Sequence, residues 1–171
     1  MYVIKKPTWL PKTLNLDGKW EDVLERLYGI FEADFINGKP RFEGMPVWWN
    51  RAEDVDWVYE EGFWHLISEK DKKTKERIPD FGRAKRLPWC APLLTNSADS
   101  AVTVFEYREA SGKVRTYVWL VAFDYLVVLE KQCRRDSSGN SFHVCFLITA
   151  YFLCGDSSRR RIRGKYENRI K

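Results

Sequence analysis

The segment FHVCFLITAYF, residues 142–152, carries groups that could act on a ligand. In a β-strand, side chains two residues apart share a face. One predicted face is wholly apolar and consists of Val144, Phe146, Ile148, Ala150 and Phe152. The other includes an imidazole, a hydroxyl and a phenol, and consists of His143, Cys145, Leu147, Thr149 and Tyr151. We expect the first face to pack on a core and the second to face a ligand.

The composition around this strand predicts a ligand that carries phosphate. Residues 157–171, SSRRRIRGKYENRIK, follow the strand at once and are strongly basic. Hydroxyl groups beside many cations suit a phosphodiester. The same cluster also fits an exposed tail that only aids solubility, although its preference for arginine over lysine favours phosphate contact. Its cations are Arg159, Arg160, Arg161, Arg163, Lys165 and Arg169.

Size and composition indicate one domain spanning residues 1–171. A chain of 171 residues that is 44% hydrophobic can bury a core, which excludes a mainly disordered protein. The net charge of +5 permits nucleic-acid binding. There is no signal-peptide pattern and no apolar run of membrane-spanning length, so we expect a cytoplasmic protein without a membrane partner. The four cysteines form no CxxC pair, which argues against a zinc site, and the sequence implies no cofactor.

Residues 1–53 are predicted to form an N-terminal helical extension. Apolar residues keep helical spacing from Trp20 until Asn37–Gly38, and Asp17 or Gly18 could cap this helix. The following residues 39–51 are rich in Pro and Gly, which predicts a loop. Its pair Trp48–Trp49 fits two roles, capping the core or stacking on bases.

Residues 54–171 are predicted to form the core of the domain, beginning with two helices. The first runs over residues 54–67, with His65 near its end. Its buried side is expected to comprise Val55, Val58, Tyr59, Phe63 and Leu66. The charged segment 68–77 should be exposed and mobile. Pro79–Asp80 then starts a helix that Pro88 and Pro92 either kink or divide into two parts.

From residue 101 the apolar period changes to two, which predicts strands. Residues 101–109 and 113–123 form a hairpin around Ser111–Gly112, and a third strand starts after Phe123–Asp124. The loop DSSGN, residues 136–140, leads into the strand described first. We therefore predict an α+β fold, with the N-terminal helices packed on one face of a four-stranded antiparallel sheet and a basic C-terminal tail or helix. The open face would present Lys113, Arg115, Tyr117 and Trp119 to RNA.

The order of these elements resembles the barnase–EndoU–colicin–RelE-like ribonuclease superfamily, in particular its phage-associated branch. The resemblance covers residues 54–169, and its most specific part is the ending TAY of the last strand. The segments that carry it are, in order, FWHLIS, RAKRLPWCAPLLTN, GKVRTYVW, YLVVLEK and LITAYF.

This resemblance implies an endoribonuclease that needs no metal and attacks the phosphate with the ribose 2′-hydroxyl. It would be a toxin or phage-defence enzyme acting on tRNA or mRNA, with a neutralising antitoxin or immunity partner. His65 would be the general base or acid, because an imidazole titrates near neutral pH. Thr149 and Tyr151 would hold the scissile phosphate, and Arg83 and Arg86 would stabilise its charge. The RNA-binding residues would be Arg115, Tyr117, Arg160, Arg161 and Lys165.

The chain departs from this family in one respect. Many relatives carry a second His or a Lys near the first His, and the sequence does not select one here. The nearest basic residues are Lys70, Lys72, Lys73, Lys75 and Arg77. His143 lies too far along the strand from Tyr151 to fill the role and is expected at the surface. The departure favours a second hypothesis, a non-catalytic RNA-binding or regulatory module, and a third is a protein that docks a partner through its Trp-rich loop.

Overall fold

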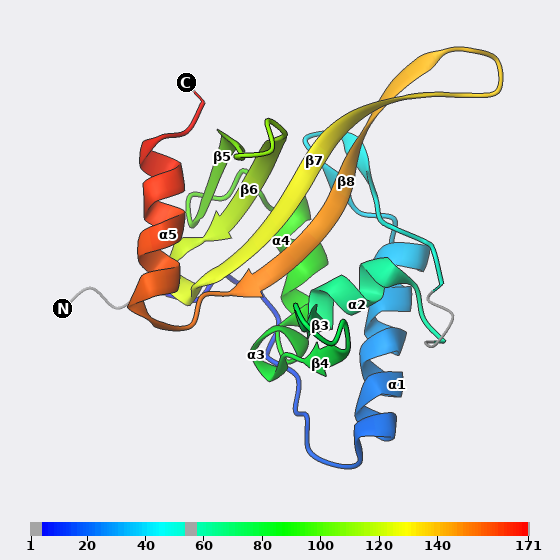
Figure 1. Ribbon diagram of the computed structural model, residues 1–171, viewed down its shortest axis with the longest axis vertical. Helices are drawn as coiled ribbons and strands as arrows, with labels where there is room; N and C mark the ends of the chain where they lie inside the picture. The colour runs from blue at the N-terminus through cyan, green and yellow to red at the C-terminus, as the bar shows by residue number, and fades with distance from the viewer. Residues whose placement is uncertain (1–4, 54–57, 171) are drawn as a thin grey trace.

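The main sheet of the protein has six strands in the order β1-β2-β8-β7-β6-β5. Figure 1 shows the computed structural model, which describes residues 5–53 and 58–170. The strands are β1 Arg41–Phe42, β2 Met45–Trp48, β5 Val102–Arg108, β6 Val114–Leu120, β7 Tyr125–Arg135 and β8 Ser141–Phe152. A separate two-stranded hairpin is formed by β3 Ser68–Lys70 and β4 Arg77–Pro79.

The helices lie on both sides of this sheet. The first side carries α1 Trp20–Phe31, α2 Glu61–Ile67, α3 Phe81–Ala84 and α4 Cys90–Thr95, and the other side carries α5 Gly155–Glu167 (Figure 1). The short helical segments are the π-helix η1 Glu32–Asn37 and the 3-10 turns η2 Leu87–Trp89 and η3 Val121–Phe123. No helix in the described part of the chain is both long and apolar enough to span a bilayer.

The predicted fold, helices on one face of a four-stranded antiparallel sheet, is wrong in two respects. First, β2 pairs in parallel with β8 through Val47 and Trp48, and β1 adds a sixth strand, so the sheet is mixed. These two strands come from residues 39–51, which were expected to be a loop. Second, α5 covers the face that was expected to be open, where Tyr117 and Trp119 are buried.

Two apolar clusters explain why both faces are covered. The larger one joins α1, α2 and α4 to the first face of the sheet through residues such as Leu27, Phe63 and Leu93. The smaller one lies beneath α5, where Ile162 packs with Tyr117, Trp119, Phe105, Leu126, Val128 and Leu153. Removing this apolar surface from water stabilises α5 on the sheet.

A β-bulge overturns the predicted faces of β8. Thr149 pairs with Val128 and Leu147 pairs with Leu129, so Ile148 is an extra residue in the ladder. As a result Leu147 and Ala150 both pack in the larger cluster, although they are three residues apart. Ile148 and Tyr151 pack against the smaller cluster. Leu147 therefore does not share a face with Tyr151, as strict alternation predicted.

The region before the third helix also differs from expectation. Helix α2 begins only at Glu61, and Val58, predicted to be buried, is exposed. The predicted helix start at Asp54 and the predicted buried Val55 lie outside the described residues. The segment 68–77, expected to be exposed throughout, forms most of the β3–β4 hairpin, and its two end residues are buried.

Several local predictions are confirmed. Val23, Leu27 and Phe31 recur one turn apart in α1 and are buried, although neither Asp17 nor Gly18 caps the helix, whose N-cap is Lys19. Asp80 is the N-cap of α3, and its carboxylate accepts the Arg83 backbone N–H at 3.0 Å. The hairpin of β5 and β6, the loop at residues 136–140 and the two-part helix after Asp80 are present.

Candidate functional site

An open groove of about 450 Å³ lies where α2, α3 and the β3–β4 hairpin meet the C-terminal half of β8. Its lining residues are His65, Ser68, Glu69, Lys70, Arg77, Arg83, Ile148, Thr149, Tyr151 and Arg161. A second hollow of about 240 Å³ continues between the sheet and α5. It is lined by Glu109, Arg115, Tyr117, Val128, Ile148, Thr149, Tyr151, Arg161, Ile162 and Lys165. The two share four residues, so they form one groove centred on the end of β8.

His65 presents a partly exposed imidazole to this groove. The side chain is 42% exposed, and its Nε2 lies 3.2 Å from Glu61 Oε2, one helical turn earlier. Burial lowers the pKa of His65 below its ordinary value of 6.5, and the charge of Arg77 adds to this effect. The Glu61 carboxylate and the Ile148 backbone carbonyl act in the opposite direction without cancelling it. The imidazole is therefore mainly neutral at pH 7 and able to accept a proton.

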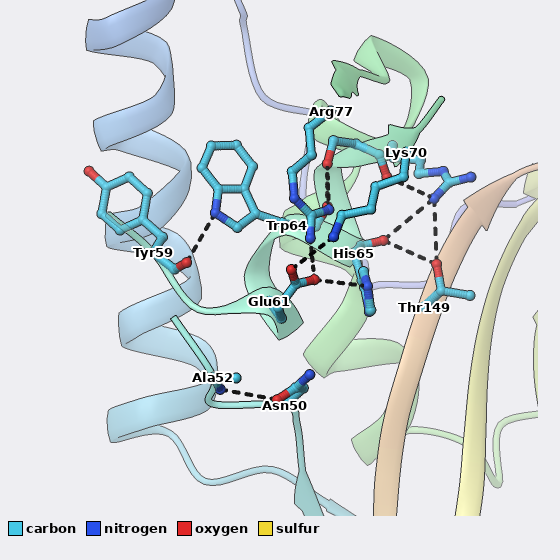
Figure 2. A network of polar contacts seen from close by, with 11 residues as sticks. Asn50, Ala52, Tyr59, Glu61, Trp64, His65, Lys70, Arg77 and Thr149 are labelled. Atoms are coloured by element: carbon cyan, nitrogen blue, oxygen red, sulfur yellow. Dashed lines mark hydrogen bonds and ion pairs between the residues drawn. The ribbon is translucent and has the colours of Figure 1, made fainter. Parts of the chain in front are cut away.

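Glu61 is the centre of a polar network behind the imidazole (Figure 2). Its carboxylate pairs with Arg77, Lys70 and His65. The Arg77 side chain is only 2% exposed, lies over the Trp64 ring at 5.8 Å and donates from Nη1 to Ser68 Oγ at 3.4 Å. A buried guanidinium needs a carboxylate partner, so Glu61 both stabilises Arg77 and fixes the imidazole.

Arg83 connects α3 to the two strands that border the groove. Its guanidinium is almost fully buried, donates to the Ser68 carbonyl at 3.2 Å and lies 4.7 Å from the centre of the Tyr151 ring. It also ion-pairs with Glu69 and Asp80. Arg83 thus supports the phenol from behind while two carboxylates balance its charge.

Thr149 and Tyr151 occupy the floor where the two parts of the groove meet. The Thr149 hydroxyl donates to the His65 backbone carbonyl at 3.1 Å, which joins the end of α2 to the edge of β8 (Figure 2). Arg161 lies above them on α5, is exposed, and makes no ion pair or hydrogen bond with any residue from 5–53 or 58–170. Its charge is therefore available to a ligand in the groove.

The α5 side of the groove is held by a second polar cluster. Lys165 Nζ donates to both Glu109 oxygens at 2.7 Å and to the Tyr117 hydroxyl at 2.6 Å. Burial raises the pKa of Tyr117, and its hydrogen bond to Glu109 raises it further, so the phenol keeps its proton. Arg115 likewise pairs with Glu130.

The structure brings together most of the predicted site residues, but not all. His65, Arg83, Thr149, Tyr151, Arg115, Tyr117, Arg161 and Lys165 line the two parts of the groove. Arg86 does not line it; its guanidinium lies 3.4 Å from the centre of the Phe152 ring and donates to the Gly82 carbonyl. Arg160 is exposed on α5 and lines neither part. Tyr117 is buried by α5, so its ring is not a platform for a stacked base.

Glu61, Glu69 and Glu109 were not predicted as site residues. Each is a carboxylate that fixes a basic group in the groove. One signal could have identified Glu61, because it precedes His65 by four residues on a predicted helix. Within residues 5–53 and 58–170, no group of three or more His, Cys, Asp or Glu side chains is arranged to hold a metal ion.

Comparisons of the chain with protein-family models, with curated proteins and with solved structures found no match in any of the three.

Proposed function

We propose that the protein is an endoribonuclease that cleaves tRNA or mRNA through the ribose 2′-hydroxyl, without a metal, as a toxin or phage-defence enzyme. The resemblance to the barnase–EndoU–colicin–RelE-like ribonucleases motivates the reaction, and the groove at the end of β8 supports it. Such an enzyme would act on RNA in a cytoplasm and would need a neutralising partner to protect its own cell.

The observation that carries this proposal is that one open groove contains an imidazole, a phenol, a hydroxyl and an unpaired guanidinium. A neutral His65 would take the proton of the 2′-hydroxyl as that oxygen attacks the adjacent phosphorus. Arg161 would bind the phosphate oxygens, Thr149 would join it by turning its hydroxyl proton from the His65 carbonyl to the phosphate, and Tyr151 would protonate the departing 5′-oxygen. Arg83 would support Tyr151 through the ring contact described above.

The test is RNA cleavage by the purified protein in EDTA, with the new ends analysed for a 2′,3′-cyclic phosphate. His65→Ala and Tyr151→Phe should each lower the rate by about 10²–10⁴-fold, the range expected for loss of a general acid or base. His143→Ala is the matched control, because His143 is exposed on β8 and lines neither part of the groove. Full cleavage by both groove variants would refute the assignment of these two residues.

A second candidate function, a non-catalytic RNA-binding or regulatory module, is favoured by the carboxylates in the groove. Arg77 and Arg83 are already paired with Glu61, Glu69 and Asp80, which leaves fewer cations for a phosphorane. This function predicts RNA binding that weakens steeply with salt, without cleavage over a long incubation. Sequencing cellular RNA ends after brief expression of the wild type and of His65→Ala separates the two functions.

A further inference from the structure

A separate cavity, of about 580 Å³, lies at the other edge of the sheet, next to β1 and β2. It shares no lining residue with the groove at the end of β8. Its apolar lining includes Phe35 of η1 and Trp49, which are both buried. Its volume falls within the range of pockets that bind small molecules, about 300–1,000 Å³.

The charge lining this cavity is positive and largely unpaired. Lys39, Arg41 and Arg51 line it and are exposed. Across the described ranges, the side chains of Lys39 and Arg51 form no ion pair or hydrogen bond, whereas the Arg41 guanidinium donates to the Gly44 carbonyl. Among the described residues, the one carboxylate of the lining is Glu60, which accepts a hydrogen bond from the Tyr28 hydroxyl at 3.0 Å. Unlike Arg77, Arg83 and Arg115 of the groove, these cations form no ion pair with a carboxylate in the described part of the chain.

Aromatic rings accompany these cations. Trp48 lines the cavity and is 37% exposed, although most large apolar side chains of the protein are buried. Its ring meets Phe142 at an interplanar angle of 64° and a centroid distance of 5.6 Å, which holds the indole in place by an edge contact. The Arg51 guanidinium lies over the Trp49 ring at 4.8 Å, which positions that charge at the cavity.

The indole nitrogen of Trp49 also distinguishes the wall of this cavity. Its Nε1 is buried and has no hydrogen-bond partner within the described parts of the chain. A buried donor without a partner is costly and uncommon in folded proteins. This cost is consistent with a wall shaped for binding rather than for stability alone.

We propose that this cavity binds a phosphorylated nucleoside, with the phosphate held by Lys39, Arg41 and Arg51 and the base stacked on Trp48. The cations supply charge and donors for a phosphate, and the exposed indole supplies a flat apolar surface for any base. The ligand is either a free mononucleotide or one nucleotide of a single-stranded RNA. Only the second source depends on the RNA-directed function proposed above.

The test measures binding with the full chain carrying His65→Ala, so that RNA is not cleaved. Calorimetric titrations use AMP, UMP and inorganic phosphate, and fluorescence anisotropy uses a labelled 12-nucleotide single-stranded RNA. Trp48→Ala removes the stacking ring, and Arg51→Gln removes one unpaired cation. Lys12→Gln is the matched control, because Lys12 is exposed and lines none of these hollows.

We expect Trp48→Ala and Arg51→Gln each to weaken nucleotide binding about tenfold, and Lys12→Gln to leave it unchanged. If only the RNA binds, and both variants weaken it, the ligand is a nucleotide within a chain. Phosphate binding as tightly as AMP and UMP, with no effect of Trp48→Ala, would overturn base recognition. Binding of every probe unchanged in both variants, or no binding of any probe, would overturn the site itself.

These results are independent of the catalytic assignment. Nucleotide binding that depends on Trp48 in a protein that never cleaves RNA would refute the nuclease and keep this site. Cleavage that depends on His65, with no probe binding sensitive to Trp48, would support the nuclease and overturn this site.

Discussion

Replacing Glu61 by Gln should destabilise the protein by about 3 kcal/mol. The substitution removes the only carboxylate paired with Arg77 among the residues that the structure describes, and the Arg77 side chain is 2% exposed. Leaving a buried charge without its partner costs roughly 3–5 kcal/mol. The lower end applies here, because the Glu61 side chain is itself 15% exposed and glutamine can still accept one hydrogen bond.

Urea denaturation measures this loss. With a slope of about 2 kcal/mol per M, a loss of about 3 kcal/mol lowers the midpoint by about 1.5 M. Glu69→Gln is the matched control, since Glu69 also pairs with a buried arginine but is 62% exposed, and Arg83 keeps its ion pair with Asp80. The control should lose no more than about 1 kcal/mol.

A second substitution tests the cause. Arg77→Met removes the buried charge, so Glu61→Gln added to it should cost about 1 kcal/mol or less, because the apolar chain leaves no unpaired cation. If Glu61→Gln costs the same with and without Arg77, or costs no more than the Glu69→Gln control, the reasoning is wrong.

The pH dependence gives an independent check of the same pair. Burial alone would raise the pKa of Glu61, but hydrogen bonds from Arg77 and Lys70 outweigh it and hold the pKa below its ordinary value of 4.5. A carboxylate whose pKa is lowered by folding stabilises the protein above its unfolded-state pKa. The stability difference between wild type and Glu61→Gln should therefore be full above pH 4.5 and shrink as the pH falls through the lower folded-state value.

Three other outcomes follow from the same contacts. Gly62→Ala should lower the free energy of unfolding in urea by about 1–3 kcal/mol, because the added Cβ would lie 2.8 Å from a buried tryptophan. Gly29→Ala should raise it by about 0.5–1 kcal/mol, because that Cβ would meet no atom within 4 Å outside its own helix. In an NMR titration His65 should show a pKa below 6.5 that falls further in Glu61→Gln, which removes a nearby negative charge; an unchanged pKa would contradict the contact. Lys165→Met should speed amide exchange in α5, because it removes the cation that joins this helix to a carboxylate near the sheet, and unchanged exchange would rule that link out.

Elements that depend on local pattern could be predicted from the sequence. The β5–β6 hairpin follows from alternating apolar residues on both sides of Ser111–Gly112, and Gly112 adopts the positive φ of 83° that such a turn favours. The start of α3 follows from Asp80, whose side chain supplies the cap. In each case the residues that determine the element are close together in the chain.

The six-stranded arrangement of the sheet could not be predicted, because β2 pairs with β8, a strand far from it in the sequence. Strand β2 has only four residues and includes Pro46, which argues against a strand in a single sequence. Its pairing with Cys145 and Phe146 of β8 joins segments about a hundred residues apart. Nothing in the local pattern of residues 39–51 indicates that pairing.

The burial of Arg77 also could not be predicted, because it depends on residues of another element. The run of charges in residues 68–77 is typical of an exposed loop, and most of its members are exposed. Arg77 is buried only because Glu61 on α2 supplies a carboxylate and Trp64 a ring surface. Sequence reasoning named several basic residues that line the groove, but not the carboxylates that pair with Arg77, Arg83 and Lys165.

The bulge at Ile148 links these observations to the chemistry of the groove. Without the bulge, regular alternation from Leu147 would put Thr149 and Tyr151 on the face of Leu147 and so place a hydroxyl and a phenol in the larger apolar cluster. Burying such groups without partners is unfavourable. With it, Ala150 fills the core position, and Thr149 and Tyr151 line the groove beside His65. The sequence prediction put Thr149 and Tyr151 on the side of β8 where the groove lies, but it wrongly placed Leu147 beside them, because the irregular position at Ile148 cannot be read from the alternating pattern.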